Sequence, residues 1–225
     1  MDGNRRFARE KGFKDVVMGY TLGARQLMQI FPWCFSIGIK SLTVWAMSND
    51  NFNRDPSEVK GLIDMMTVFF QDFLLLDASV PLMGVRIRVT GDKNILPESL
   101  RMAIQAVEDA TSNNENYNFQ IAINYGGREE IVMAVKKAVS QLPENNLDLL
   151  ESTDISRYTY AAQFGLDPVD AILRTSGEIR LSGFHLWESQ NAEFCFLPCK
   201  WPELSERQFL GAALNLAKRS RRNGL

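Results

Sequence analysis

The chain has 225 residues, of which 45% are hydrophobic and 23% are charged. This balance is typical of a globular protein with a sizeable buried core, and it predicts a single domain spanning residues 1–225. The formal net charge of -2 excludes a strong overall field that would hold the chain on nucleic acid or on an anionic membrane, so we expect no nucleic-acid partner.

The cysteines and the apolar runs narrow the class further. Cys34, Cys195 and Cys199 are too few for a disulfide scaffold. Together with His185, the only histidine, the last two supply three soft ligands where structural zinc takes four, which disfavours zinc. No apolar run reaches the ~18 to 20 residues of a membrane span, and no charged-then-apolar leader opens the chain. We therefore expect a soluble protein without stable membrane insertion.

Strand-like and helix-like segments alternate along the chain. The opening MDGNRRFA predicts the end of a strand running into a polar turn. Apolar, β-branched runs then predict strands at 41–47, 84–91, 119–126, 170–175 and 193–198. Helical spacing predicts helices at 16–31, 56–77, 97–112, 127–141 and 205–221, and a surface loop is expected at 142–154. This order predicts an α/β fold with a mainly parallel central sheet flanked by helices.

Ligands of such folds bind beyond the carboxyl ends of the strands. Four polar clusters occupy strand ends or, in the first case, the end of a truncated strand: residues 2–6, 47–54, 124–129 and 174–182. We expect these clusters to converge in space. Taken alone, the cluster at 124–129 is better interpreted as a tight turn from a strand into a helix.

The cluster after the fourth predicted strand carries the strongest signal. Arg174 and Arg180 present guanidinium forks that suit phosphate oxygens, and Ser176 and Ser182 add hydroxyl donors. Together they predict a diphosphate cradle. The alternative is a surface loop in which an arginine pairs with Glu178.

The first two clusters allow two interpretations each. MDGNRR suits a magnesium-bridged diphosphate, with Asp2 on the metal and Arg6 on the phosphate, or it is only a polar turn. The amides around Phe52, with Arg54, form either a capping loop before Pro56 or the polar wall of a site. Motifs for nucleotide hydrolysis, dinucleotide binding and esterase chemistry are absent.

A long apolar stretch at 59–76 places methionines and phenylalanines on more than one helical face. Such a stripe most often belongs to the core. It would equally suit the lining of a pocket for a hydrocarbon tail.

Five segments in order resemble the cis-prenyltransferases, the undecaprenyl and dehydrodolichyl diphosphate synthase-like family, over essentially the whole chain. They are MDGNRR, SNDNFNR, NYGGRE, RTSGEIRLSGFHLWE with the following AEF, and the terminal Arg222-Asn223-Gly224. The resemblance implies an α/β sheet with an elongated hydrophobic tunnel, a homodimer, and Mg²⁺-dependent condensation of an allylic diphosphate with a second five-carbon diphosphate.

The resemblance also implies residue roles. Asp2 would help to bind Mg²⁺ and assist ionisation of the allylic diphosphate, and Glu193 would be the second metal ligand. Ser48 and Asn51 would lie beside the reacting carbons. The first diphosphate would contact Gly3, Asn4, Arg5, Arg6 and Arg54, the second Arg174, Arg180 and Ser182, and Arg222 with Gly224 would contact a diphosphate across the dimer interface.

Several positions around these diphosphate-binding residues depart from the family pattern. Tyr20 replaces a histidine common in the helix after MDGN, and both substrate motifs are altered. These changes favour altered carbon chemistry, and the methionine and phenylalanine stripe favours a short product. The chain is most similar to short-chain plant members that join two dimethylallyl diphosphates head to middle into lavandulyl diphosphate.

Two alternatives remain at this stage. One is regular condensation of dimethylallyl with isopentenyl diphosphate into neryl diphosphate, and the other is a non-catalytic prenyl-diphosphate-binding partner subunit. His185 would discriminate between the irregular and the regular coupling if its neutral imidazole accepts the proton that the product loses. The alternative is that His185 is a partly buried side chain beside Trp187. A plant-like member would be expected in the plastid stroma, and otherwise in the cytoplasm.

Overall fold

The fold is built around parallel strands. The computed structural model describes residues 1–75 and 84–219. Within them, β1 (Ser41–Ser48), β3 (Tyr117–Tyr125) and β2 (Val85–Thr90) form a three-stranded parallel sheet in the order β1-β3-β2. A second parallel pair joins β4 (Ala171–Arg174) to β5 (Glu193–Phe196). The predicted α/β class, its parallel pairing and its five strands are confirmed.

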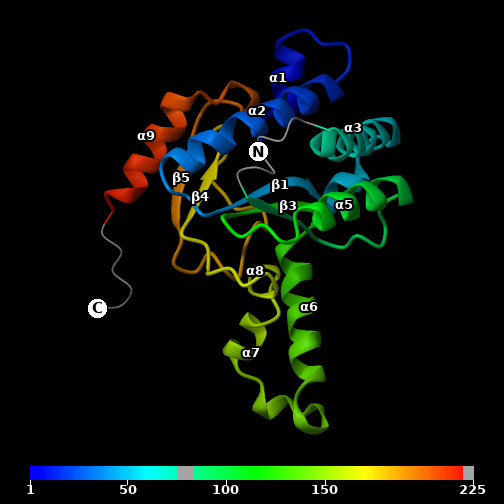
Figure 1. Cartoon of the computed structure of the whole chain (residues 1–225), viewed down its shortest axis with the longest axis vertical. Coiled ribbons are helices and arrows are strands. Elements are labelled where there is room, and N and C mark those ends of the chain that lie inside the picture. The colour runs from blue at the N-terminus through cyan, green and yellow to red at the C-terminus, as the bar shows by residue number, and fades with distance from the viewer. Residues whose placement is uncertain (76–83, 220–225) are drawn as a thin grey trace.

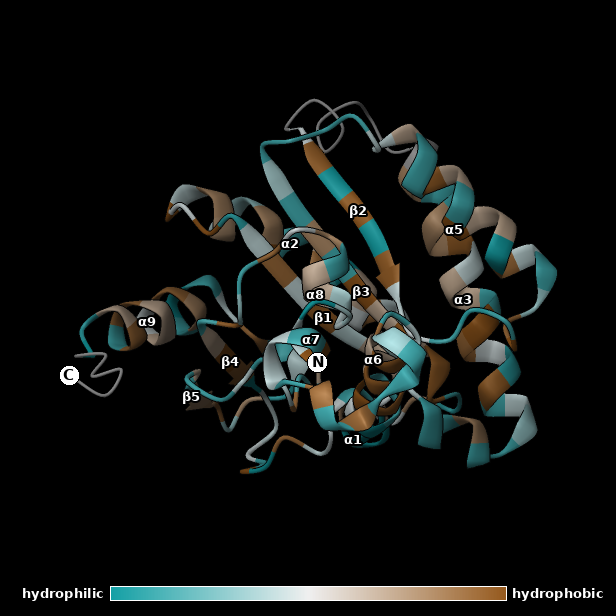
Figure 2. Ribbon diagram, turned by 90° about the horizontal axis from the view of Figure 1, so that it is seen from below, coloured by the Kyte–Doolittle hydropathy of each residue, from teal (hydrophilic) through white to brown (hydrophobic). Residues whose placement is uncertain are grey.

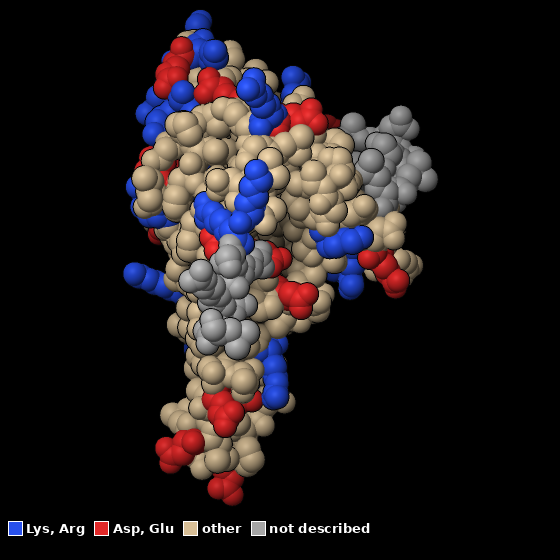
Figure 3. Space-filling view, turned by 90° about the vertical axis from the view of Figure 1, so that its left-hand side faces the viewer, with Lys and Arg blue, Asp and Glu red and all other residues tan. Residues whose placement is uncertain are grey.

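Helices cover both sides of the larger sheet (Figure 1). In that view α2 and α3 lie above β1 and β3, whereas α6 runs downward and projects with α7 away from the sheet. Figure 3 shows acidic side chains at the tip of this projection. The helices are α1 (Asn4–Glu10), α2 (Val17–Ser36), α3 (Pro56–Leu75), α5 (Glu98–Ala110), α6 (Gly127–Ser140), α7 (Ser152–Ser156), α8 (Tyr160–Gln163) and α9 (Glu206–Ala217), with short 3₁₀ turns η1 (Asn49–Asn53), η2 (Pro143–Asn145), η3 (Leu147–Leu149) and η4 (Trp201–Glu203).

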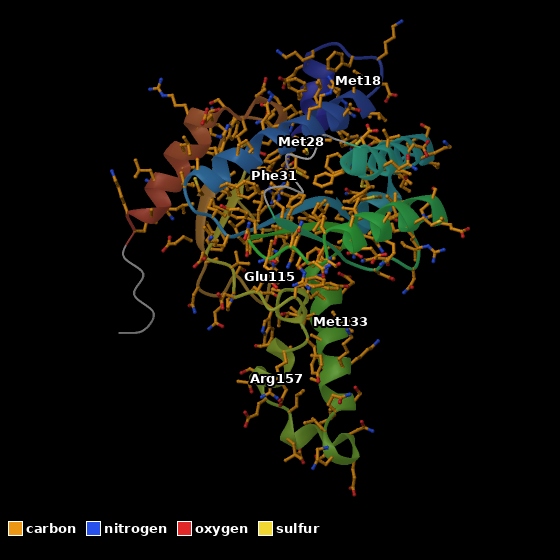
Figure 4. All side chains as sticks on the ribbon, in the orientation of Figure 1. Met18, Met28, Phe31, Glu115, Met133 and Arg157 are labelled. Carbon is orange, nitrogen blue, oxygen red and sulfur yellow. The ribbon has the colours of Figure 1, made fainter. Side chains whose placement is uncertain are left out.

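The core lies between the sheet and α2, α3 and α5. Phe31 of α2 points to the sheet (Figure 4), where its ring meets Phe119 of β3 edge-on with centroids 4.5 Å apart. The central strand β3 is buried along most of its length, as expected for a parallel strand covered on both faces. The edge strand β2 alternates between apolar and polar residues (Figure 2).

Two predictions near the start of the chain differ most from the structure, and the predicted helix at 205–221 is also too long, because α9 ends at Ala217. The expected strand end and polar turn at the start of the chain is wrong, because residues 4–10 form α1. Gly3 caps this helix at a φ of 99°, and a Cβ there would lie 2.7 Å from the Ser176 hydroxyl oxygen, so only glycine fits. The predicted end of α2 at residue 31 is also too early, because the helix continues through Pro32 to bury Cys34.

The segment 142–154 was predicted to be a surface loop. It is largely exposed, but it contains η2, η3 and the first residues of α7. No residue of η2 or η3 is buried, so the sequence has no apolar periodicity there that would predict these turns.

Candidate active site

A pocket of about 500 Å³ opens beyond the carboxyl ends of β1 and β4. Its walls come from the start of the chain through α1, from the end of β1 with η1, and from the loop after β4. The lining residues are Met1, Asp2, Gly3, Asn4, Arg5, Arg6, Arg9, Tyr20, Trp45, Ala46, Met47, Ser48, Asp50, Asn51, Arg54, Ile172, Leu173, Arg174, Arg180, Leu181, Ser182 and Phe184.

Asp2 is tied to the end of β4. A guanidinium nitrogen of Arg174 donates to one Asp2 carboxylate oxygen over 2.9 Å, and the Gly3 amide donates to the other over 2.8 Å. The backbone of Asp2 exchanges two further hydrogen bonds with the Thr175 hydroxyl. Burial alone would raise the pKa of Asp2, but the hydrogen bonds from Arg174 and Gly3 outweigh burial and lower it. Asp2 is therefore a carboxylate at neutral pH.

Arginine dominates the charge of the pocket. Six arginines line it, against two aspartates, so the wall carries a positive excess that suits a polyanion: Arg5, Arg6, Arg9, Arg54, Arg174 and Arg180. Glu178 bridges the two walls, because its carboxylate oxygens lie 2.8 Å from Arg6 and 2.6 Å from Arg180. Arg174 also donates to the Ser182 hydroxyl over 2.9 Å. Arg174, Arg180 and Ser182 of the predicted cradle thus line the pocket, whereas Ser176 does not, and the alternative pairing with Glu178 is also present.

A second charged group centres on Glu58, which is only 9% exposed. Its carboxylate accepts from the Tyr20 hydroxyl at 2.7 Å, and it pairs with Arg54 at 3.2 Å and with Arg5 at 3.1 Å. Arg54 also donates to the Tyr20 oxygen over 2.6 Å. Sequence reasoning overlooked Glu58, although its spacing of four residues from Arg54 on a predicted helix was a usable signal.

Ser48 and Asn51 cap η1. The two residues form a reciprocal capping box, in which the Ser48 amide donates to the Asn51 side chain over 3.3 Å. Both residues also line the pocket. The two interpretations of the segment 47–54, capping loop and site wall, therefore both apply.

Some predicted site residues lie elsewhere. Glu193 does not line the pocket, and its carboxylate pairs at 2.7 Å with Arg219, two residues beyond the end of α9. Arg222 and Gly224 fall outside the described residues. No residue of 124–129 lines the pocket, although the segment lies beside the cluster at 47–54, because Tyr125 pairs with Ser48 in the sheet. It forms the turn into α6, where the Gly127 amide donates to the Gly183 carbonyl over 2.9 Å.

His185 is 4% exposed and lies behind the pocket wall. Its ring centroid is 4.5 Å from that of Phe184, which does line the pocket. Its Nδ1 atom is 3.5 Å from a carboxylate oxygen of Glu188. Burial alone would raise the pKa of Glu188, but the neighbouring imidazole outweighs burial and lowers it. The buried interpretation of His185 matches this position, and its neighbours are Phe184 and Glu188.

The pocket offers few protein ligands for a magnesium ion. Among residues 1–75 and 84–219, no three acidic, histidine or cysteine side chains are grouped to hold a metal ion by themselves. Mg²⁺ is usually held by one or two carboxylates plus the phosphates of its substrate, and it keeps several waters. Asp2 fits that pattern, because its carboxylate is 37% exposed at the pocket wall and stands beside arginines that suit phosphate.

Comparisons with known proteins define the family. A family described as putative undecaprenyl diphosphate synthase matches residues 1–224. A tritrans,polycis-undecaprenyl-diphosphate synthase (geranylgeranyl-diphosphate specific) of Thermoplasma acidophilum is 39% identical over 99% of this chain and 86% of its own length. An isoprenyl transferase of Thermus thermophilus is 38% identical over 100% of this chain and 86% of its own length.

Two solved structures share the fold. Lavandulyl diphosphate synthase from Lavandula x intermedia, in complex with dimethylallyl diphosphate, matches with a TM-score of 0.91 and 31% identity over 100% of this chain and 95% of that chain. A probable undecaprenyl diphosphate synthase from Campylobacter jejuni matches with a TM-score of 0.80 and 25% identity over 91% and 92% of the two chains. The chain belongs to the cis-prenyltransferase family of undecaprenyl diphosphate synthases, and the predicted enzyme class, a prenyltransferase, is confirmed. This family generally uses Mg²⁺.

Two findings bear on where in the cell this protein was expected to lie. In the part of the chain that the structure describes, no helix is both long and apolar enough to span a membrane. The curated relatives named above are archaeal and bacterial, so they give the expected plastid location no support.

Proposed function

We propose that residues 1–225 form one catalytic domain that condenses two five-carbon prenyl diphosphates and releases diphosphate. The observation that carries this proposal is one pocket lined by arginines from two parts of the chain. Arg5, Arg6 and Arg54 come from α1 and the end of η1, and Arg174 and Arg180 come from β4 and the loop after it. Two groups of this kind suit two diphosphates, and Asp2 contacts Arg174 of the second group.

The proposed substrates are two molecules of dimethylallyl diphosphate, joined head to middle into lavandulyl diphosphate. The likeness to a lavandulyl diphosphate synthase over the whole chain supports this choice. The relative from Thermoplasma acidophilum is named for an undecaprenyl product instead. A short product is favoured here because the apolar cavity next to the pocket has a volume of only about 50 Å³.

In the proposed reaction, the C–O bond of the donor breaks and diphosphate departs with the electron pair. The double bond of the acceptor supplies the electrons for the new C–C bond, and loss of one proton completes the product. Arg5, Arg6 and Arg54 hold the departing diphosphate, where the growing negative charge strengthens their contacts in the transition state. Bound Mg²⁺ would supply further stabilisation of that charge, with Asp2 as its protein ligand.

The β4 side of the pocket would hold the acceptor. Arg174, Arg180 and Ser182 grip its diphosphate, so its double bond faces the donor carbon. Fixing two reactants in this way can contribute about 7 to 11 kcal/mol in well-oriented systems. Ser48 and Asn51 lie on the wall beside this space. His185 takes no part in the proposed reaction, because Phe184 lines the pocket and His185 packs behind it.

We also propose that the chain works as a homodimer, as the family resemblance implies. Glu193 lies outside the pocket of its own chain, and Arg222 and Gly224 follow α9 in sequence. These residues would complete a site across the interface with a second copy. Sedimentation of the purified protein tests this state, and a monomer that remains fully active would contradict it.

Product analysis tests the function. Purified protein is incubated with Mg²⁺ and dimethylallyl diphosphate alone, then with isopentenyl diphosphate added, and the dephosphorylated alcohols are identified. Lavandulol from dimethylallyl diphosphate alone is the expected result. Nerol that forms only when isopentenyl diphosphate is present would replace the irregular coupling with the regular one. No product at any Mg²⁺ concentration would leave a binding subunit and overturn the proposal.

A further inference from the structure

Two hollows of this protein share a wall. The first is the arginine-lined pocket of about 500 Å³, and the second is an apolar cavity of about 50 Å³. Four residues line both of them: Met1, Asn4, Tyr20 and Ala46. Beyond this shared wall the cavity is lined by apolar side chains of α2, α3 and β3, among them Leu27, Met65, Phe69 and Ile121. A hydrocarbon chain that grows out of the pocket toward the core must therefore pass the shared wall.

Tyr20 is the largest of the shared residues, and it is held at its far end. Its hydroxyl donates to Glu58 over 2.7 Å and accepts from Arg54 over 2.6 Å. Glu58 is itself buried and anchored by Arg5 and Arg54. Swinging the Tyr20 ring aside would break both hydrogen bonds and remove one partner from a buried carboxylate, which is costly. The ring is therefore a fixed part of the wall.

The space behind the ring is small. An apolar cavity that accepts benzene, with six carbons, measures about 150 Å³. The cavity behind Tyr20 has about 50 Å³, a third of that volume. It does not hold one further five-carbon unit without movement of the side chains around it.

We propose that Tyr20 limits the length of the allylic donor by closing the arginine-lined pocket against the apolar cavity. This inference rests on the proposed condensation and names the residue that restricts the donor to five carbons. The product itself carries no allylic diphosphate and cannot serve as a donor. Neither the aromatic ring nor its tether reacts with substrate, so Tyr20 acts as a specificity-determining residue. Its position in α2 puts it on the same helical face as Leu27, seven residues later, which lines the cavity behind it.

Three variants separate the ring, its tether and the cavity. Tyr20→Ala removes the ring and should join the two hollows. Tyr20→Phe keeps the ring and removes only the hydroxyl. Met65→Ala enlarges the apolar cavity behind an intact Tyr20. Circular dichroism spectra and melting curves of all three establish that they fold.

The first measurement is product length with dimethylallyl diphosphate as the acceptor and geranyl or farnesyl diphosphate offered as competing donors. Wild type is expected to give only ten-carbon products, and Tyr20→Phe a small share of longer ones, because its ring has lost the two hydrogen bonds that hold it. Tyr20→Ala is expected to give mainly products of fifteen carbons or more. Met65→Ala alone should leave the length unchanged, and combined with Tyr20→Ala it should lengthen the products further. Lengthening by Met65→Ala alone, or none by Tyr20→Ala, would overturn the inference.

The second measurement does not depend on turnover. Calorimetry compares binding of the unreactive thiolo analogues of dimethylallyl and farnesyl diphosphate. Tyr20→Ala is expected to strengthen binding of the farnesyl analogue about tenfold relative to the dimethylallyl analogue, and Tyr20→Phe is expected to shift this ratio less. An unchanged ratio in Tyr20→Ala would reject the gate. If wild type forms no product while the ratio shifts as expected, the proposed condensation fails and the gate stands.

Discussion

Asp2 and Arg174 are 172 positions apart in the sequence, and the guanidinium of Arg174 donates to the Asp2 carboxylate over 2.9 Å. This contact joins the start of the chain to the end of β4. It places the predicted metal carboxylate of one wall against the predicted diphosphate arginine of the other. The side chains that would bind the two proposed substrates are therefore hydrogen-bonded to each other.

Arg174→Ala is expected to lower kcat/KM by about 10- to 100-fold, because it removes charge-assisted hydrogen bonds to substrate and leaves Asp2 without its partner. Steady-state kinetics with dimethylallyl diphosphate measure the change. Arg157→Ala, which removes a 72% exposed arginine on the projecting segment, is the control and should leave kcat/KM unchanged. Equal kinetics of the two variants would remove Arg174 from the site.

Asp2→Asn is expected to change how stability depends on pH. The pKa of Asp2 is lowered in the folded protein, so its contribution to stability is present above the ordinary value of 3.8 and is lost as the pH falls through the folded value. The difference in melting temperature between wild type and Asp2→Asn should therefore shrink as the pH falls below 3.8. Asp72→Asn, which removes an exposed carboxylate of α3, should show no such trend. A difference that stays constant as the pH falls would contradict this account.

Glu58→Ala is expected to reduce the free energy of unfolding by about 1 to 3 kcal/mol, because Tyr20, Arg5 and Arg54 lose their shared acceptor. Urea denaturation measures the loss. The matched control is Asp64→Ala, which breaks the exposed pair with Lys60 and should cost less than about 1 kcal/mol. A smaller loss for Glu58→Ala than for the control would show that the group around Glu58 does not stabilise the fold.

His185→Leu is expected to destabilise the protein by about 1 to 3 kcal/mol, because Glu188 stays buried without the imidazole beside it. It should change the rate or the product through Phe184 while leaving dimerisation intact. Thermal melting, product analysis and sedimentation are measured on the same sample. Unchanged stability together with unchanged kinetics would mean that the imidazole has no role here.

The strands and most of the helices follow from local pattern. Runs such as residues 41–47 and 119–126 are apolar and bounded by polar turns, and the structure has β1 and β3 there within two residues at each end. The failures arise where packing overrides local preference. Helix α2 continues past Pro32 because residues beyond the proline, such as Cys34, are buried against the core.

The candidate site was predictable in part. Arginines and hydroxyls at 174–182 indicated an anion cradle from their chemistry alone, and Arg174, Arg180 and Ser182 do line the pocket, although Ser176 does not. Glu58, by contrast, lies within an amphipathic helix, where a single acidic residue ordinarily faces water. Only the packing of α3 beside α2 shows that it accepts from Tyr20 and holds two arginines.

The amino-acid sequence by itself determined the parallel α/β order, the family and the polar residues available at the strand ends, because periodicity and motif chemistry act over a few neighbouring positions. Only the tertiary structure decided which of those residues meet. It brought Asp2 to Arg174, set Tyr20 between the two hollows and put His185 behind Phe184. Such contacts depend on how helices and sheet pack across the whole chain, and no local pattern records that packing.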